Sequence, residues 1–96
     1  MIKDIDLHDA TLIAVRVDWS DGICIAEIQH GTLGKCSLTF SALTNLTLPR
    51  EKGWGSSVSI NSFSAPRTGW YEIEMQSGDC ISIAATGMVL SRLEQN

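Results

Sequence analysis

The sequence predicts an all-β fold: a compact antiparallel sandwich or partly open barrel of six or seven short strands with hairpin connections. Three observations predict it. Several runs alternate apolar and polar residues, turn dipeptides separate these runs, and no segment shows a convincing helical period over more than three turns. The chain has 96 residues, of which 44% are hydrophobic and 19% charged. This composition suits one globular domain, so we expect residues 1–96 to form a single β domain.

The first hairpin is predicted around residues 10–19 and the turn that follows them. One face of this alternating run carries Ile13, Val15, Val17 and Trp19. Asp21-Gly22 is the dipeptide that best supports a two-residue type I′ turn. A loop of two residues would place Arg16 directly opposite Glu27, as a favourable cross-strand pair of charges.

A second hairpin is predicted in the C-terminal half, between the runs 70–76 and 80–85. A three-residue loop, Ser77 to Asp79, would pair Ile73 with Ile83 and leave Glu72 and Glu74 facing outward. The faces of both runs are set by the period-2 alternation.

Weaker patterns complete the predicted sheet. In the run 36–42, Cys36, Leu38, Phe40 and Ala42 share a face, and the alternation breaks at Leu43, which predicts a bulge or bend. The run 58–64 reads as an edge strand with Val58, Ile60 and Ser62 inward. Residues 87–96 show only a weak helical spacing.

Composition and charge limit the kinds of partner that we expect for this protein. Seven Lys and Arg against eleven Asp and Glu give a net charge of −4, which disfavours a nucleic-acid partner. No apolar stretch approaches the length of a membrane helix, and the acidic start lacks a signal peptide, so we expect a cytoplasmic protein with no membrane partner. Cys24, Cys36 and Cys80 are an odd number without a C-x-x-C motif, and are predicted to be buried free thiols in a reducing compartment.

One candidate for chemistry lies near the N-terminus. Asp4, Asp6 and His8 alternate, so in an extended segment they would point one way and could hold a hard metal ion or transfer a proton. The favoured alternative is a solvated leading segment in which His8 or Asp9 satisfies backbone groups at a turn.

Two further groups of residues are candidate sites. Cys24, His30 and Cys36 are spaced more widely than short zinc motifs, and are better explained as separate core and strand-end residues. Glu72 and Glu74 could act as paired carboxylates, but an outward solvated face explains them. There is no G-x-S-x-G motif and no phosphate-binding glycine loop. We therefore expect no enzyme activity, no catalytic residue, no metal and no cofactor.

A basic, tryptophan-containing region is the most suggestive feature for binding. Tryptophan and arginine are enriched at interaction hot spots. The candidate partner-binding residues are Arg50, Lys52, Trp54, Arg67 and Trp70. The alternative is that Trp54 folds back to close one end of the sheet layers. The acidic faces are a second candidate surface, suited to a basic partner.

The chain also resembles a known group of small, mostly uncharacterised bacterial proteins. The motifs that carry this resemblance are Leu7-His8-Asp9-Ala10-Thr11-Leu12, Val17-Asp18-Trp19, Gly22, Pro49-Arg50, Trp54-Gly55, Ser59-Ile60-Asn61 and the run 73–79, IEMQSGD. The opening pattern HD-x-x-L…DW…G is also similar to polymorphic-toxin immunity proteins of family 50. The resemblance implies a bacterial, cytoplasmic, all-β domain with a protein-binding role, and it supplies no catalytic residue.

The sequence therefore predicts a small non-enzymatic protein-binding module. The resemblance implies, more specifically, an immunity-like protein. Its partner would be another protein, either a toxin or a second copy of the chain. The alternative is a structural or housekeeping domain that forms a homodimer through a sheet edge. A metal-dependent enzyme that uses Asp4, Asp6 and His8 is the least favoured hypothesis.

Overall fold

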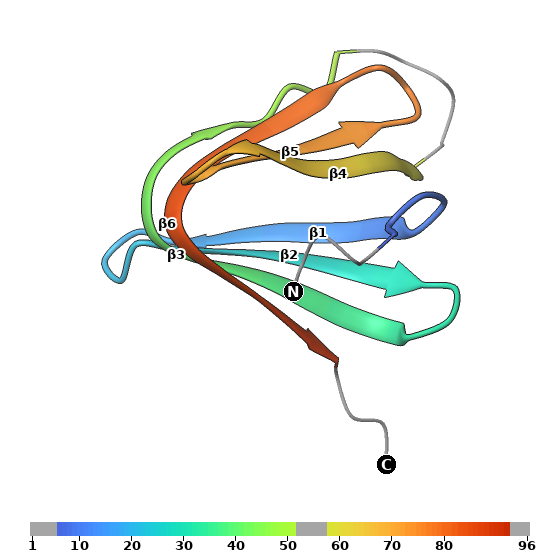
Figure 1. Cartoon of the computed structure of the whole chain (residues 1–96), viewed down its shortest axis with the longest axis horizontal. Coiled ribbons are helices and arrows are strands. Elements are labelled where there is room, and N and C mark those ends of the chain that lie inside the picture. The colour runs from blue at the N-terminus through green and yellow to red at the C-terminus, as the bar shows by residue number, and fades with distance from the viewer. Residues whose placement is uncertain (1–5, 52–57, 93–96) are drawn as a thin grey trace.

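The computed structural model describes residues 6–51 and 58–92, which form one antiparallel sheet of six strands. The sheet order is β1-β2-β3-β6-β5-β4 (Figure 1). The strands are β1 Thr11–Asp18, β2 Ile23–His30, β3 Gly34–Thr47, β4 Ile60–Arg67, β5 Trp70–Met75 and β6 Cys80–Arg92. The all-β prediction is confirmed. Within the described residues, no helix is long and apolar enough to cross a membrane.

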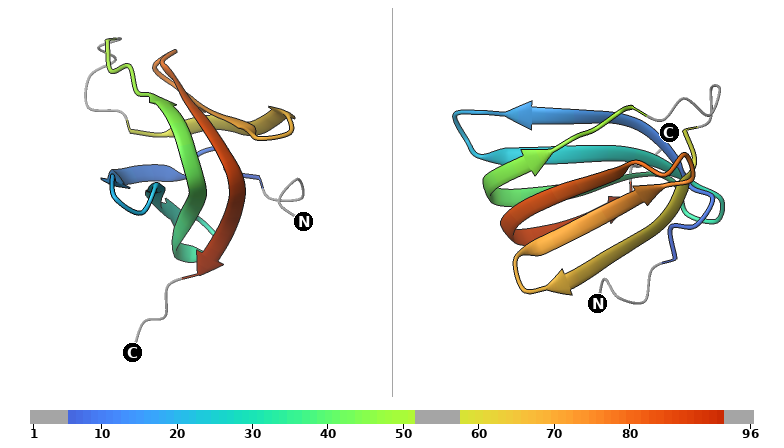
Figure 2. Two further views of the ribbon diagram at one scale, coloured as in Figure 1. Left: turned by 90° about the vertical axis from the view of Figure 1, so that its left-hand side faces the viewer. Right: turned by 90° about the horizontal axis from the view of Figure 1, so that it is seen from above.

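The two central strands, β3 and β6, are long and bend together, so the sheet folds over into two layers (Figures 1 and 2). β1 and β2 lie beside the first part of β3, whereas β5 and β4 lie beside the first part of β6. The bend falls where Ala42 has a positive φ of 52° and where the β3–β6 register shifts between Leu43 and Asn45. The predicted irregularity at Leu43 is confirmed.

The two edge strands, β1 and β4, approach each other at one end only. The N–H of Asp9 donates to the carbonyl of Ile60 at 2.8 Å, and the N–H of Ile60 donates to Ala10 at 2.8 Å. The N–H of Leu12 donates to the carbonyl of Val58 at 2.9 Å. β1 and β4 do not pair along their lengths, so the structure is a sandwich or open barrel that is tied at one end.

The core fills the space between the layers, as the alternating patterns predict. Cys36, Leu38 and Phe40 are buried, and the rings of Phe40 and Tyr71 lie with centroids 5.2 Å apart. Tilted aromatic contacts of this kind add to the stabilisation that burial gives. The inward prediction for Ala42 is wrong because its position at the bend turns it to solvent.

In both hairpins the predicted register is wrong by two residues, and outside the bulge of β1 the paired residues keep their predicted faces. In the first hairpin, Asp18 pairs with Ile23 and Arg16 pairs with Ile25, not with Glu27. A shift of two residues leaves every side chain on its predicted face. Arg16 therefore still reaches Glu27 diagonally, with Nη1 3.3 Å from Oε1.

The first turn is longer than predicted because Asp18 organises it. The carboxylate of Asp18 accepts a hydrogen bond from the N–H of Asp21 at 3.1 Å. The N–H of Gly22 donates to the carbonyl of Trp19 at 3.3 Å, and Gly22 has a φ of 65°. Residues 19–22 thus form a four-residue loop built on a local turn, instead of a two-residue type I′ turn.

The second hairpin shows the same shift. Ile73 pairs with Ile81, two residues before its predicted partner. The N–H of Gly78 donates to the carbonyl of Met75 at 2.9 Å, and Gly78 has a φ of 104°. The three-residue loop is therefore 76–78, with glycine at the position that needs a positive φ.

Part of the predicted inner face of the first strand is exposed. A bulge between Leu12 and Ala14 turns Ile13 outward, while Val15 packs against the core as predicted. Val17 is 46% exposed and Trp19, carried beyond the strand by the turn, is 93% exposed. The predicted common face is therefore wrong for Ile13 and Trp19, whereas Val17 shares the face of Val15, opposite Cys24, but stays about half exposed.

Two other predictions at the strand ends need correction. In the predicted edge strand Ile60 is buried, but Val58 and Ser62 are exposed, because a register shift after Ile60 presents Phe63 to the core instead. The weak helical spacing after residue 87 is misleading. β6 continues to Arg92, with Val89 outward and neighbouring side chains packed on the core.

Candidate functional site

The predicted basic and aromatic residues are only partly brought together. Lys52 and Trp54 lie outside the described residues. Arg67 and Trp70 pair across the β4–β5 hairpin, with the guanidinium carbon of Arg67 5.0 Å from the centroid of the indole ring. The indole N–H of Trp70 donates to Glu72 Oε2 at 3.0 Å. The ring face and the N–H of Trp70 are thus both engaged within the hairpin.

Arg50 lies at the other end of the same layer. The N–H of Glu51 donates to Asp79 Oδ1 at 3.2 Å, at the start of β6, whereas Trp70 pairs with Ala84. Ala84 is five steps along the chain from Asp79, or roughly 16 Å at about 3.3 Å per step. The described structure therefore does not join Arg50 to the hairpin pair.

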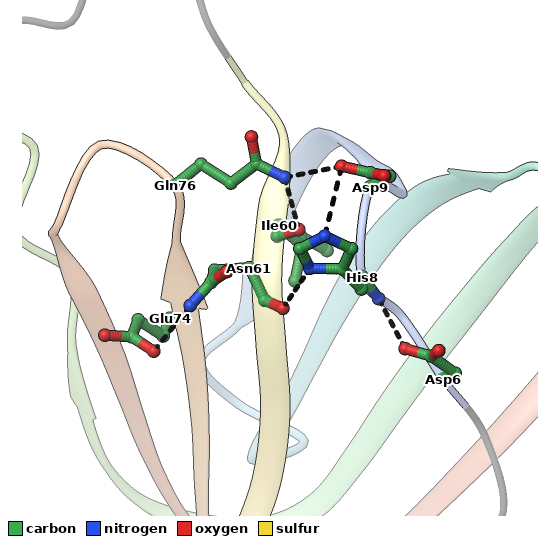
Figure 3. Close-up of polar contacts among 7 residues, drawn as sticks. All are labelled: Asp6, His8, Asp9, Ile60, Asn61, Glu74 and Gln76. Carbon is green, nitrogen blue, oxygen red and sulfur yellow. Dashed lines mark hydrogen bonds and ion pairs between the residues drawn. The ribbon is translucent and has the colours of Figure 1, made fainter.

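A second candidate region surrounds His8, in the turn before β1 (Figure 3). Its Nδ1–H donates to the carbonyl of Asn61 at 2.8 Å, and its Nε2 lies 3.6 Å from Asp9 Oδ1. The backbone N–H of His8 donates to Asp6 Oδ1 at 2.9 Å. The prediction that His8 satisfies a backbone group at a turn is confirmed by the contact with Asn61. Asp4 lies outside the described residues.

Asp9 and Gln76 extend this cluster across the seam between the two layers. Asp9 has a positive φ of 70°, which carries the chain from the turn into β1. The side-chain amide of Gln76 donates to Asp9 Oδ1 at 2.6 Å and to the carbonyl of Ile60 at 3.3 Å (Figure 3). Gln76 therefore binds the N-terminal turn and the start of β4 at once.

Glu72 and Glu74, the candidate pair of carboxylates, each have a different partner. Glu74 Oε1 accepts from the side-chain amide of Asn61 at 3.0 Å and from the hydroxyl of Ser62 at 3.2 Å. Glu72 accepts from the indole of Trp70. Glu74 therefore links β5 to β4, whereas the hydrogen bond of Glu72 lies within β5.

Electrostatics at His8 follow from these contacts. The hydrogen bond to the carbonyl of Asn61 raises the pKa of His8 above its usual 6.5, and the carboxylates of Asp9 and Asp6 raise it further against a smaller desolvation effect. The charged imidazolium is thus favoured because it donates toward an acceptor from each nitrogen. Among the described residues, no group of three or more His, Cys, Asp or Glu is arranged to hold a metal ion.

The candidate zinc ligands Cys24, His30 and Cys36 are spread over the sheet. Cys24 pairs with Phe40 and Cys36 pairs with Ile28, so the two thiols lie four residues apart along adjoining strands, about 13 Å. Both nitrogens of His30 are engaged with backbone groups: Nδ1 accepts from two N–H groups of the following loop, and Nε2 donates to the carbonyl of Asp6 at 2.9 Å. These positions do not form a tetrahedral site.

A groove beside the first turn was missed at the level of sequence, because Trp19 was assigned to the inner face. We call it the turn groove. It has a volume of about 440 Å³ and is lined by Val17, Asp18, Trp19, Gly22, Leu43, Thr44, Asn45 and Leu46. The N–H of Leu43 donates to the carbonyl of Gly22 at 2.9 Å, which fixes the turn against β3. The D-W-x-D-G run could have signalled it, since Asp and Gly there favour a projecting turn.

Comparisons with known proteins add no relative: no family model, no curated protein and no solved structure matches the chain. The resemblance of its motifs to small bacterial proteins and to immunity proteins thus stays a prediction.

Proposed function

We propose that this protein is a small non-enzymatic protein-binding module that contacts its partner through the turn groove. The observation that carries the proposal is Trp19, whose side chain is 93% exposed at the rim of the groove. A tryptophan is the side chain that gains most from burial against a partner, through its area and its polar N–H. Val17, 46% exposed, adds apolar surface on the same side.

The turn groove supports binding better than the predicted basic surface does. The indole of Trp70 already stacks with Arg67 and donates to Glu72, so a partner would have to compete with these contacts. No such contact of the Trp19 ring is found among the described residues. The immunity-like version of the proposal, with a toxin as partner, rests on the motif resemblance alone.

Affinity capture tests this proposal. The wild-type chain, Trp19→Ala and Arg67→Ala are immobilised and exposed to a lysate of the source cells, and any stoichiometric partner is then purified and rebound. We expect a partner whose affinity falls about tenfold or more with Trp19→Ala and little with Arg67→Ala. Val89→Ser is the matched control, because Val89 is an exposed apolar residue at another place.

Two results would count against the proposal. A purified partner that binds Trp19→Ala as tightly as the wild type would remove the turn groove as the contact surface. If no protein binds the wild type at stoichiometry, the module has no such partner. In that case the alternative of a self-associating domain is decided by sedimentation at micromolar concentration.

A further inference from the structure

The part of β3 beyond its bend has an open edge. β2 pairs with β3 only over Gly34 to Phe40, whereas β6 pairs with β3 as far as Thr47. Among the described strands, residues 44–47 thus have a neighbouring strand on one side only, while Leu43 donates its N–H to the carbonyl of Gly22 on the other side. Figure 2 shows this part of β3 at the rim of its layer. An open edge of this kind can accept a further strand, because its outward N–H and C=O groups point toward solvent.

This edge lacks the features that usually protect an edge strand from pairing. Charged residues and proline are typical guards. The outer strand β1 carries Arg16 and Asp18, and the outer strand β4 ends in Pro66 and Arg67. Residues 43–48, Leu-Thr-Asn-Leu-Thr-Leu, contain no charge and no proline, and Leu48 is 50% exposed.

The turn groove runs along the first part of this edge. Its lining joins Val17 and Trp19 of the first hairpin to Leu43, Thr44 and Leu46 of β3. Thr44, Asn45 and Leu46 line the groove, so a strand laid along residues 44–48 would lie within it and could reach Trp19. Since alternate side chains of a strand point to the same face, such a strand could place one apolar side chain against Trp19 and Val17.

The charge around the groove selects the kind of strand. Asp18 is the one charged residue of the lining, and Asp21 follows it in the same exposed turn. Neither carboxylate forms an ion pair with a described residue, and the chain has a net charge of −4. If the incoming strand came from a second copy of this chain, two acidic turns and two negatively charged chains would meet at one short edge and would repel each other. A lysine or arginine in the incoming strand would instead complement the groove.

We infer that the turn groove and the open edge of β3 receive an extended, basic segment of a partner protein, which adds as a strand beside residues 44–48. This inference rests on the proposed binding function and names the partner's chemistry. In this complex Trp19 is the apolar anchor. Asp18 and Asp21 bind a lysine or arginine of the segment, and the backbone of β3 forms the hydrogen bonds between the strands. Pro49 ends the usable edge, so the segment spans about five residues at the edge.

The probe is a library of random nine-residue peptides selected on the immobilised wild-type chain, followed by synthesis of the enriched sequences. We expect enrichment of peptides with alternating β-branched or aromatic residues and at least one lysine or arginine. Amide hydrogen exchange should slow at residues 44–48 when such a peptide is bound. Trp19→Ala should weaken binding about tenfold or more. Val89→Ser should leave it unchanged.

A variant without the two acidic charges measures the electrostatic contribution to peptide binding. In Asp18→Asn with Asp21→Ser, the Asn oxygen can still accept the turn hydrogen bond, while both charges are lost. Binding should weaken several-fold and lose most of its salt dependence. Circular dichroism confirms that each variant is folded.

Several results overturn the inference while leaving the proposed function standing. They are enriched peptides that are acidic or proline-rich, protection at β1 or β4 in place of β3, and a dimer that Trp19→Ala dissociates. Failure to enrich any peptide also overturns it. If, in addition, the capture experiment gives no Trp19-dependent partner, the proposed function fails as well.

Discussion

The imidazole Nδ1 of His8 lies 2.8 Å from the carbonyl oxygen of Asn61, fifty-three residues further along the chain. This contact joins the turn before β1 to the edge strand β4, at the end where the two layers meet. The neighbouring backbone bonds between Asp9, Ala10 and Ile60 make the same connection. His8 thus adds a pH-dependent contact to backbone hydrogen bonds that do not titrate.

The first prediction concerns the pH dependence of stability at His8. Its pKa is raised in the folded chain, so the stabilisation is fully present below the ordinary value of 6.5 and is lost as pH rises through the folded pKa. The melting temperature of the wild type should therefore fall slightly more than that of His8→Gln between pH 5.5 and pH 8.5. Equal pH profiles for the two proteins would show that protonation of His8 does not contribute to the stability of the fold.

The second prediction concerns Gln76, which closes the same seam from the other layer. Gln76→Leu removes donors to the Asp9 carboxylate and to the carbonyl of Ile60. Because the contacts are largely exposed, we expect a loss of about 1 kcal/mol in the free energy of unfolding, measured with urea. Gln29→Leu is the control, since Gln29 is an exposed glutamine on β2. An equal effect of both substitutions would assign no special role to the seam.

The third prediction compares two turn glycines. Gly22 has a φ of 65°, whereas Gly31 is in open space without a positive φ. Gly22→Ala should destabilise the chain by about 1 kcal/mol because alanine is strained in that conformation. Gly31→Ala should be neutral or slightly stabilising in the same urea titration. The reverse order of the two variants would contradict the four-residue turn.

The strand faces could be predicted from the sequence because burial imposes a period of two. Ile73 and Phe40 are buried as their alternation indicates, and the bend of β3 was visible as a break in phase at Leu43. The register could not be predicted from the same pattern. A shift of two residues preserves every face, so only turn geometry decides it, and Asp18 reshaped the first turn with a side-chain hydrogen bond.

The candidate site was harder to predict, since it depends on contacts between distant segments. The alternation that correctly placed Val15 inward also suggested that Trp19 was inward, although it belongs to the turn. The open edge of β3 exists because β2 ends opposite Phe40 while β6 continues. β2 and β6 pair with β3 over different lengths because the sheet folds into two layers. No local sequence pattern predicts this difference.

The last prediction concerns the three free thiols. Burial raises the pKa of Cys24 and Cys36, and burial together with the carboxylates of Glu72 and Glu74 raises the pKa of Cys80. The thiolate is the reactive form. Because Cys80 is only partly buried, Ellman's reagent at pH 8 should label one thiol in the native chain, slowly, and all three in urea.

A substitution tests the cause of this slow reaction. Glu72→Gln removes one of the two charges but keeps an oxygen that can accept from the indole of Trp70. The pKa of Cys80 should fall, so its labelling at pH 8 should become faster. Cys80→Ser should abolish the native reaction. Native labelling that persists in Cys80→Ser would show that Cys24 or Cys36 opens to solvent, against the packing of both thiols between the layers.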